Sequence, residues 1–373
     1  MALHRCVVAD FLTETTLTEI DLSVDTCQRR IVIPGAFRAT YPLPNRTEAD
    51  RARHIVAGRT NIHMYRDSDL WGSYLIRYAQ PAMDENGKLT LQIAGSSLEI
   101  YPYLRKIRAD LTYAGQDQIT IARALLSDMA TRTEGDMGLD LMSGTSGVLR
   151  DRTYLASESA TYGQRLEELA NVANGFEHMI RVGVDSSTGA RTKTWIWGYP
   201  TLGNPGITRV IDQPGQIKAW AYAADATQAA TAWQARGATI QDDLGTASQP
   251  LMSTVYEDAA LLAAGWPLLD QTADYLSVRE VATLNAYAQQ LRDTRSGAVG
   301  IPRVLVHFDD AFSIDPNFLG DTAAFTLVND WFPLDTGGVP TFAKNWRIVG
   351  MDLHTPTGED QEERAELIFE EAA

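Results

Sequence analysis

Histidine supplies the first candidates for metal binding or acid–base chemistry, and the chain has six histidines. Two pairs are plausible sets of ligands: His54 with His63, and His307 with His354. Neither pair has a His-x-x-x-His or His-Glu-x-x-His context, the spacing that puts two ligands on one face of a helix. We therefore expect these histidines to have surface or core roles.

Serine and aspartate offer no stronger centre. The turns 95–98 and 144–147 contain serine, but both lack the second glycine of a Gly-x-Ser-x-Gly nucleophile elbow. Asp309, Asp310 and Asp315 resemble a calcium loop only in charge, because the central glycine and the terminal glutamate are missing. No phosphate loop or dinucleotide fingerprint occurs. The sequence therefore indicates no catalytic, cofactor-binding or metal-binding residue.

Cys6 and Cys27 are the two cysteines of the chain, and the 20 residues between them match no metal-ligand spacing. We expect two reduced, partly buried thiols, because a free cysteine behaves as a small hydrophobic residue. A late disulfide in an exported particle is the alternative.

Two function classes stay open at this point. A carbohydrate-active protein would take an acid pair from the acidic C-terminal block, with Trp195, Trp197 and Trp220 as sugar platforms. Trp195 and Trp197 lie two residues apart on an expected strand and share a face, which is more typical of core packing. A receptor-binding or carbohydrate-binding module is the second class. Such modules are usually compact sandwiches, and the two helical insertions described below argue against one.

The charge of the chain is uneven, and this limits its partners. Residues 1–110 carry 14 Lys/Arg and 13 Asp/Glu, whereas residues 111–373 carry 18 and 35, so the acidic excess behind the net charge of −16 lies entirely in the second part. Nucleic acids are bound through Lys and Arg, which neutralise phosphates. The excess predicts either a solvated acidic surface or a lining that repels DNA.

The length of 373 residues indicates two to four domains and more than one core. No apolar run approaches the roughly 20 residues that span a bilayer, and the N-terminus has no signal-peptide pattern. We expect a protein made and kept in the cytoplasm, or one carried inside an assembly.

The elements that would position a site follow one plan twice: β-type sequence with Gly and Pro turns, amphipathic helices, then more β-type sequence. Residues 1–115 alternate mostly with a period of two and are expected to form a first small β-barrel. Within them Asn86-Gly87 predicts a hairpin, because this pair supplies the positive φ of a two-residue turn. The polar stretch 45–53 is interpreted as a long exposed loop or arm.

Residues 116–205 are interpreted as an α+β insertion domain. Two apolar stripes at helical spacing occur there, and the second begins at a capping box formed by Thr161 and Gln164. The strand-like segments 176–184 and 194–199 then predict a hairpin.

Residues 206–245 together with 301–373 are expected to form a second β-barrel. Between them lies a predicted helical insertion, 246–300, with helices over 254–264 and 277–292. The predicted fold class is therefore α+β, mainly β, with two similar small β-barrel domains that carry α/β and helical insertions.

This arrangement of elements resembles a family of phage proteins. Residues 71–107, with a strand, the Asn-Gly turn, a second strand and the passage 95–104, are similar to the first domain of minor tail proteins of siphophages. The closing segments 318–321 and 346–351 resemble the same family. Its members are similar to the N-terminal hub part of tail-associated proteins and to the baseplate hub of contractile phages.

The resemblance implies a phage tail-tip hub that is a structural protein and not an enzyme. Hub members form homotrimers in which two barrels per subunit make a ring of six, matching a hexameric tail tube to a threefold tip around the DNA channel. The implied neighbours are the distal tail protein ring, the tape measure protein and other tail-tip proteins. Genomic DNA would pass through without specific binding. The implied location is the virion, after assembly in the host cytoplasm, and no cofactor is implied.

Longer relatives continue into a peptidase, lysozyme-like or sugar-binding region. This sequence ends with Glu370-Glu371-Ala372-Ala373, directly after its last strand candidate. We therefore expect a hub without an attached enzyme or binding domain.

Overall fold

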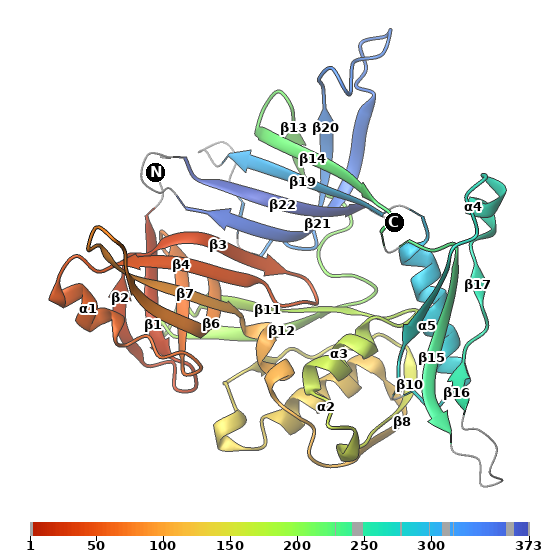
Figure 1. Ribbon diagram of the computed structural model, residues 1–373, viewed down its shortest axis with the longest axis horizontal. Helices are drawn as coiled ribbons and strands as arrows, with labels where there is room; N and C mark the ends of the chain where they lie inside the picture. Colours follow the sequence, from red (N-terminus) through yellow and green to blue (C-terminus); the bar gives the residue numbers. More distant parts are fainter. Residues whose placement is uncertain are drawn as a thin grey trace.

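A computed structural model describes residues 3–227, 229–240, 249–276, 278–297, 299–307, 314–315, 317–355 and 362–371. The chain is mainly β; α2 and α3 lie together, α4 and α5 belong to the region after β14, and the short α1 lies beside the N-terminal strands (Figure 1). Among the described residues, no helix combines the length and the apolar character needed to cross a membrane.

Seven N-terminal strands form one half of a large curled sheet in the order β3-β4-β7-β6-β5-β1-β2. The predicted hairpin is confirmed as β6–β7, and Gly87 at its turn has φ +78°. The segment 45–53 was wrongly interpreted as a loop: it contains α1 (Arg46–Ala52), because the Asn45 side chain accepts a hydrogen bond from the Glu48 N–H at 3.0 Å and begins a helix. The strand bounds are His4–Asp10 (β1), Thr16–Ile20 (β2), Ser23–Arg30 (β3), Ala36–Pro42 (β4), Thr60–Arg66 (β5), Asp69–Met83 (β6) and Leu89–Ser97 (β7).

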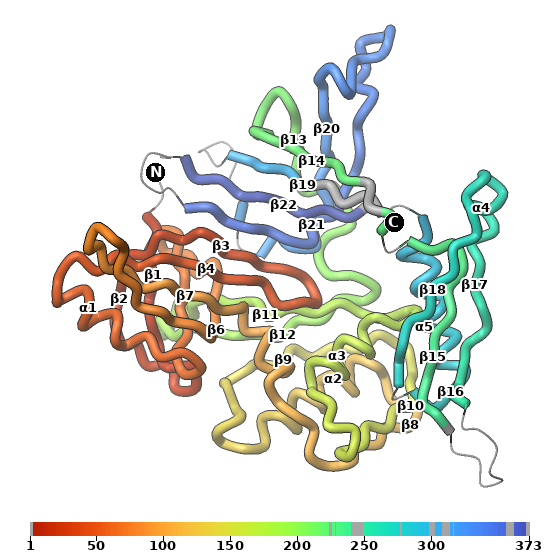
Figure 2. The backbone as a smooth tube through the Cα atoms, viewed as in Figure 1, coloured from red at the N-terminus to blue at the C-terminus, as the bar shows by residue number. Residues whose placement is uncertain are grey.

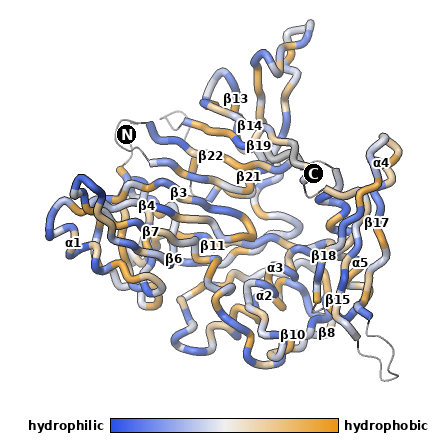
Figure 3. The backbone as a smooth tube through the Cα atoms, in the orientation of Figure 1, coloured by the Kyte–Doolittle hydropathy of each residue, from blue (hydrophilic) through white to orange (hydrophobic). Residues whose placement is uncertain are grey.

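Six strands from the second part of the chain form the other half, in the order β14-β19-β22-β21-β20-β13. Figure 3 shows hydrophobic and hydrophilic positions mixed along these strands, as expected for a sheet with one buried face. The bounds are Ile207–Asp212 (β13), Ile217–Asp225 (β14), Val299–His307 (β19), Thr322–Leu327 (β20), Phe342–His354 (β21) and Arg364–Glu371 (β22).

The two halves are joined in one 13-stranded sheet, because β21 also pairs with β3. Figure 2 shows these strands, from opposite ends of the chain, side by side. The two carboxylate oxygens of Asp352 accept hydrogen bonds from the Cys27 N–H at 2.8 Å and from Gln28 Nε2 at 2.9 Å. The prediction of two separate β domains is therefore wrong in this respect. Periodicity shows which face of a strand is buried, but not which distant strand it pairs with.

Residues 98–198, between the two halves, form an α+β region, which begins earlier than the predicted insertion 116–205. The capping box of Thr161 and Gln164 begins α3, and the predicted hairpin is confirmed as the antiparallel pair β11–β12, with β9 parallel to β12. The bounds are Leu98–Leu104 (η1), Leu111–Asp117 (β8), Gln118–Met129 (α2), Thr133–Gly135 (η2), Asp140–Leu141 (β9), Leu149–Tyr154 (β10), Ala156–Glu158 (η3), Tyr162–Ala170 (α3), Glu177–Val184 (β11) and Arg191–Gly198 (β12).

The β11–β12 hairpin lies between two hydrophobic cores. Met179 and Ile196 belong to the core inside the large sheet. Ile180, Val182 and Trp195 belong to the core formed with α2 and α3. Alternate residues of one hairpin thus attach the α+β region to the sheet.

A separate four-stranded sheet packs against α5 and corrects two expectations. Residues 232–240 were assigned to the second barrel, but they form β15, the central strand of this sheet. Residues 246–300 were expected to be a helical insertion, but they contain three strands besides two helices. Alternating sequence such as that of β15 suits either sheet, so the pattern could not decide. The bounds are Ala232–Ile240 (β15), Gln249–Met252 (β16), Tyr256–Glu257 (β17), Ala259–Ala263 (α4), Asp270–Asp274 (β18) and Val281–Arg295 (α5). The division into four segments otherwise stays a prediction.

Candidate functional site

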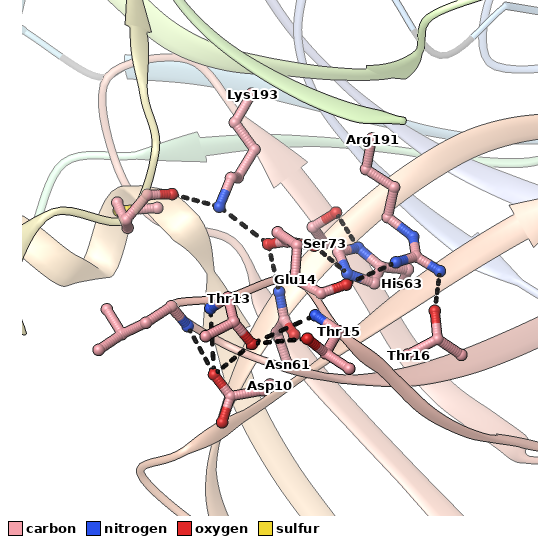
Figure 4. Close-up of polar contacts among 12 residues, drawn as sticks. Asp10, Thr13, Glu14, Thr15, Thr16, Asn61, His63, Ser73, Arg191 and Lys193 are labelled. Carbon is pink, nitrogen blue, oxygen red and sulfur yellow. Dashed lines mark hydrogen bonds and ion pairs between the residues drawn. The ribbon is translucent and has the colours of Figure 1, made fainter. Parts of the chain in front are cut away.

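Buried charged side chains gather where separate parts of the chain meet. The largest group, here called the Glu14 cluster, consists of Glu14, Asn61, His63, Ser73, Arg191 and Lys193 (Figure 4). It joins the turn between β1 and β2, the strands β5 and β6, and β12 of the α+β region. No motif in the sequence pointed to it, and the carboxylate and the amine lie 179 residues apart.

Glu14 is the centre of this cluster. Its carboxylate oxygen Oε1 accepts hydrogen bonds from Lys193 Nζ at 2.8 Å and from Asn61 Nδ2 at 3.1 Å. Its other oxygen, Oε2, lies 2.9 Å from His63 Nε2. The backbone of Glu14 has φ +56°, a left-handed conformation that is uncommon for a residue other than glycine. The turn thus holds this carboxylate in a constrained position.

Arg191 connects the same turn to β12 a second time. Its guanidinium donates to the Glu14 carbonyl at 3.3 Å, to Thr16 Oγ1 at 2.9 Å and to the Tyr65 hydroxyl at 2.9 Å. Lys193 also donates to the Met137 carbonyl, in the loop before β9. Two cations of β12 therefore bind the α+β region to the N-terminal half of the sheet.

The electrostatics of the cluster favour an ionised carboxylate. Burial alone would raise the pKa of Glu14, but the hydrogen bond and charge of His63, together with Lys193, outweigh it and lower the pKa to about 2. Burial lowers the pKa of His63 below its usual value, although Glu14 opposes this. Lys193 Nζ, 2.8 Å from Glu14 Oε1, is a second contact that favours the ionised carboxylate.

The order Ser73, His63, Glu14 is that of a nucleophile, a base and an acid, with Ser73 Oγ 2.8 Å from His63 Nδ1. The surroundings do not suit such chemistry. His63 has no exposed surface and Ser73 is 4% exposed. The cavity beside Ser73 measures about 10 Å³, which is room for about one water molecule. A substrate cannot reach this serine, so the arrangement positions the strands.

A second buried contact fixes the C-terminal half to β11. Arg347 on β21 makes a bidentate contact with Glu177: Nη2 lies 2.5 Å from Oε1 and Nη1 lies 2.6 Å from Oε2. Its Nε donates to Glu370 on β22 at 2.7 Å. Burial would lower the pKa of Arg347, but both carboxylates outweigh it and raise the pKa. This is the strong geometry for a guanidinium–carboxylate pair.

A third contact joins the two ends of the chain. Arg66 at the end of β5 binds Glu363 with two hydrogen bonds, at 2.7 and 2.9 Å. His4 Nε2 lies 3.0 Å from the same carboxylate. With these three contacts, the two halves of the sheet and the α+β region are tied together pairwise.

Solved structures share this architecture over almost the whole chain. A tail protein from Neisseria meningitidis MC58 matches 98% of this chain and 96% of its own, with a TM-score of 0.57 and 11% identity. The 43 kDa tail protein of prophage MuSo2 from Shewanella oneidensis matches 99% of both chains, with a TM-score of 0.57 and 10% identity. Prophage tail protein gp18 from Listeria monocytogenes EGD-e matches 98% and 94%, with a TM-score of 0.51 and 12% identity.

The chain has the fold of phage tail proteins. No family model and no curated protein sequence matches it. The tail-protein fold is therefore recognised through its arrangement of elements, in agreement with the resemblance noted in the sequence, and residue roles cannot be transferred at this identity.

Within this tail-protein fold the four candidate histidines lie in separate surroundings. His63 is part of the Glu14 cluster, whereas His54 is exposed after α1. His307 and His354 stand opposite Arg364 from the two sides of β22, so their backbones are two strand spacings, roughly 10 Å, apart. In the described part of the chain, no three metal-ligating side chains gather.

The tryptophans proposed as sugar platforms are packed. Trp195 is 1% exposed, and its ring stacks with that of Trp197 at a centroid distance of 6.0 Å. Trp220 packs against Phe332 at 5.3 Å. Trp195 thus has the expected core role, and Trp197 is partly buried and packs against the same core.

The remaining candidates have local structural contacts. Ser146 donates to Asp117 at 2.9 Å, and Asp117 begins α2, so this serine belongs to a turn. Asp315 pairs with Arg209 at 3.2 Å, while Asp309 and Asp310 lie outside the described residues. Both cysteines are free and buried.

Proposed function

We propose that this chain is a structural hub of a phage tail tip, forming a homotrimeric ring that adapts a hexameric tail tube to a threefold tip. The observation that carries the proposal is the match of tail-protein folds over 98% or more of the chain and 94% or more of those proteins.

The two-part sheet suits such a ring. Each chain contributes two curled halves, so three chains contribute six, and contacts of a head-to-tail kind close into a ring when their rotation closes. The Glu14, Arg347 and Arg66 contacts hold the parts of one chain in a fixed relation. A rigid protomer is what a symmetry adaptor requires.

The charge of the chain supports a channel that DNA crosses without binding. Residues 111–373 have 35 acidic and 18 basic side chains, and a wall of this composition repels phosphates. In this proposal the surplus carboxylates face the lumen. The neighbours are the distal tail protein ring, the tape measure protein and other tail-tip proteins, in a virion assembled in the host cytoplasm.

The proposal includes no enzymatic activity for this chain. The constellation with a catalytic order that the described residues contain, at Ser73, is closed to substrates. The carbohydrate-active alternative is favoured by no specific contact, because Trp195, Trp197 and Trp220 all pack against other rings.

Symmetry in the assembled tail tests this function. We expect electron microscopy of tail tips to place three copies of the chain around the channel. A single copy in the particle would overturn the trimer. A lumen lined mainly by arginine would overturn the charge argument and leave the trimer standing.

A further inference from the structure

A small cleft on the α+β region is lined mainly by arginine. Its lining residues are Arg105 and Arg108, which follow η1, and Arg132, Glu134 and Gly135, at η2. The cleft measures about 200 Å³, many times the space that one water molecule needs. Three guanidinium groups and one carboxylate give this lining a net charge of +2. A chain with a net charge of −16 thus has a positively charged cleft.

Arg105 is held in this cleft by uncharged groups. Its Nη1 donates a hydrogen bond to the Tyr101 hydroxyl at 3.0 Å, and its Nη2 donates to the Met129 carbonyl, at the end of α2, at 3.2 Å. Its guanidinium carbon lies 5.6 Å from the centre of the Tyr101 ring. Gly135 leaves room for this guanidinium, because a Cβ atom at position 135 would overlap with Nη1. These contacts fix the position of the cation and leave its formal charge uncompensated.

The carboxylates around the cleft do not neutralise it. Among the described residues, the one ion pair of its three arginines joins Arg132 to Glu134 at 3.5 Å, and these side chains are 60% and 74% exposed. Exposed pairs of this kind are weak, so Glu134 can turn to solvent at little cost. Three aspartates close by in the sequence accept hydrogen bonds elsewhere: Asp110 from the Ala156 N–H, Asp128 from the Tyr162 hydroxyl, and Asp136 from the Gly138 N–H.

We propose that this cleft binds a dianionic phosphate group, either inorganic phosphate or a phosphate monoester. Such a group carries a charge of about −1.5 to −2 at pH 7, which balances the lining. The planar fork of a guanidinium matches the oxygens of a phosphate with paired hydrogen bonds. A carboxylate, or one phosphate of a nucleic-acid strand, carries a single charge and balances the cleft less well. The site goes beyond the proposed tail function and does not depend on it.

The test is isothermal titration calorimetry of the full chain with inorganic phosphate, at an ionic strength held constant with sodium chloride. We expect saturable binding by the wild type. Arg108→Gln should weaken this binding about tenfold, because it removes a hydrogen bond between charged groups. Arg46→Gln, at an exposed position of α1, changes the net charge by the same amount and is the matched control. It should leave phosphate binding unchanged.

Gly135→Ala tests the geometry of the cleft without changing any charge. The added methyl group would displace the Arg105 guanidinium, which is the end of a flexible side chain. The fold should therefore persist, which an unchanged circular dichroism spectrum would show. Phosphate binding should weaken about tenfold, as in the Arg108→Gln variant.

Several results would overturn the site. These are no saturable binding by the wild type, or an equal loss in Arg46→Gln and Arg108→Gln, which would indicate general attraction to positive charge. Unchanged binding by Gly135→Ala would overturn the role of Arg105. Acetate or an oligodeoxythymidylate that competes as well as phosphate would overturn the preference for a dianion. Glycerol phosphate separates the two sources: binding as tight as that of the inorganic ion assigns a monoester, and no binding assigns the free ion.

Discussion

Removing the charge of Glu14 is the most direct test of the buried cluster. Its pKa falls from 4.5 to about 2 in the folded chain, and at about 1.4 kcal/mol per pKa unit this corresponds to about 3 kcal/mol of stability. Glu14→Gln keeps the shape but leaves Lys193, whose side chain is 4% exposed, without its carboxylate. We expect the free energy of unfolding to fall by about 3 kcal/mol at pH 7.

The pH dependence gives the same test a second readout. A carboxylate with a lowered pKa contributes stability that is complete above its unfolded pKa and is lost as the pH falls through the folded value. The difference between wild type and Glu14→Gln should therefore shrink between pH 4.5 and pH 2. Urea unfolding followed by tryptophan fluorescence measures both quantities.

A matched control separates the cluster from a general effect of lost charge. Glu85 is exposed in the β6–β7 turn and belongs to none of the ionic contacts described above, so Glu85→Gln should change stability by less than about 0.5 kcal/mol. A Glu14→Gln loss below about 1 kcal/mol at pH 7, or a difference that does not change with pH, would refute the reasoning.

Three other predictions concern the core and the function. Arg347→Met should lower the free energy of unfolding by about 3 kcal/mol, because Glu177 loses its buried partner, whereas the exposed Arg303→Met should cost less than about 1 kcal/mol; urea unfolding compares them. Equal losses would contradict this. Burial raises the pKa of Cys27 to about 12 and raises that of Cys6 as well, so a thiol reagent at pH 8 should label neither until urea is added. Rapid labelling of the native chain would count against buried thiols. The purified chain should release no soluble sugar or peptide from cell-wall polymer; cleavage abolished by one Asp or Glu substitution would reverse that conclusion.

Local signals in the sequence were reliable because they act over a few residues. Asn86-Gly87 predicted the β6–β7 hairpin, and the capping box at Thr161 predicted the start of α3. The partner of a strand is a different matter. Nothing near β21 or β15 in the chain indicates that one would pair with β3 and the other would leave the large sheet.

The Glu14 cluster shows the same limit for a site. Its charged members look like ordinary polar residues in the sequence, and one of them, His63, was expected to be only a surface or core residue. The Glu14–Lys193 pair gains its importance when burial removes water from both side chains. That burial depends on how β12 packs on the β1–β2 turn. A local sequence pattern cannot predict a contact between residues that lie 179 positions apart in the chain.

The pairing of β21 with β3 has a mechanical consequence. Three residue pairs and the two hydrogen bonds of Asp352 connect the two halves of a protomer through a continuous strand ladder. A tilt of one half is therefore transmitted directly to the other. In the proposed ring, the central passage could widen by bending inside a protomer only if this ladder were broken. In that proposed ring, widening would occur at the joints between protomers, and a load on one half of a protomer would reach the other half through the backbone of β21.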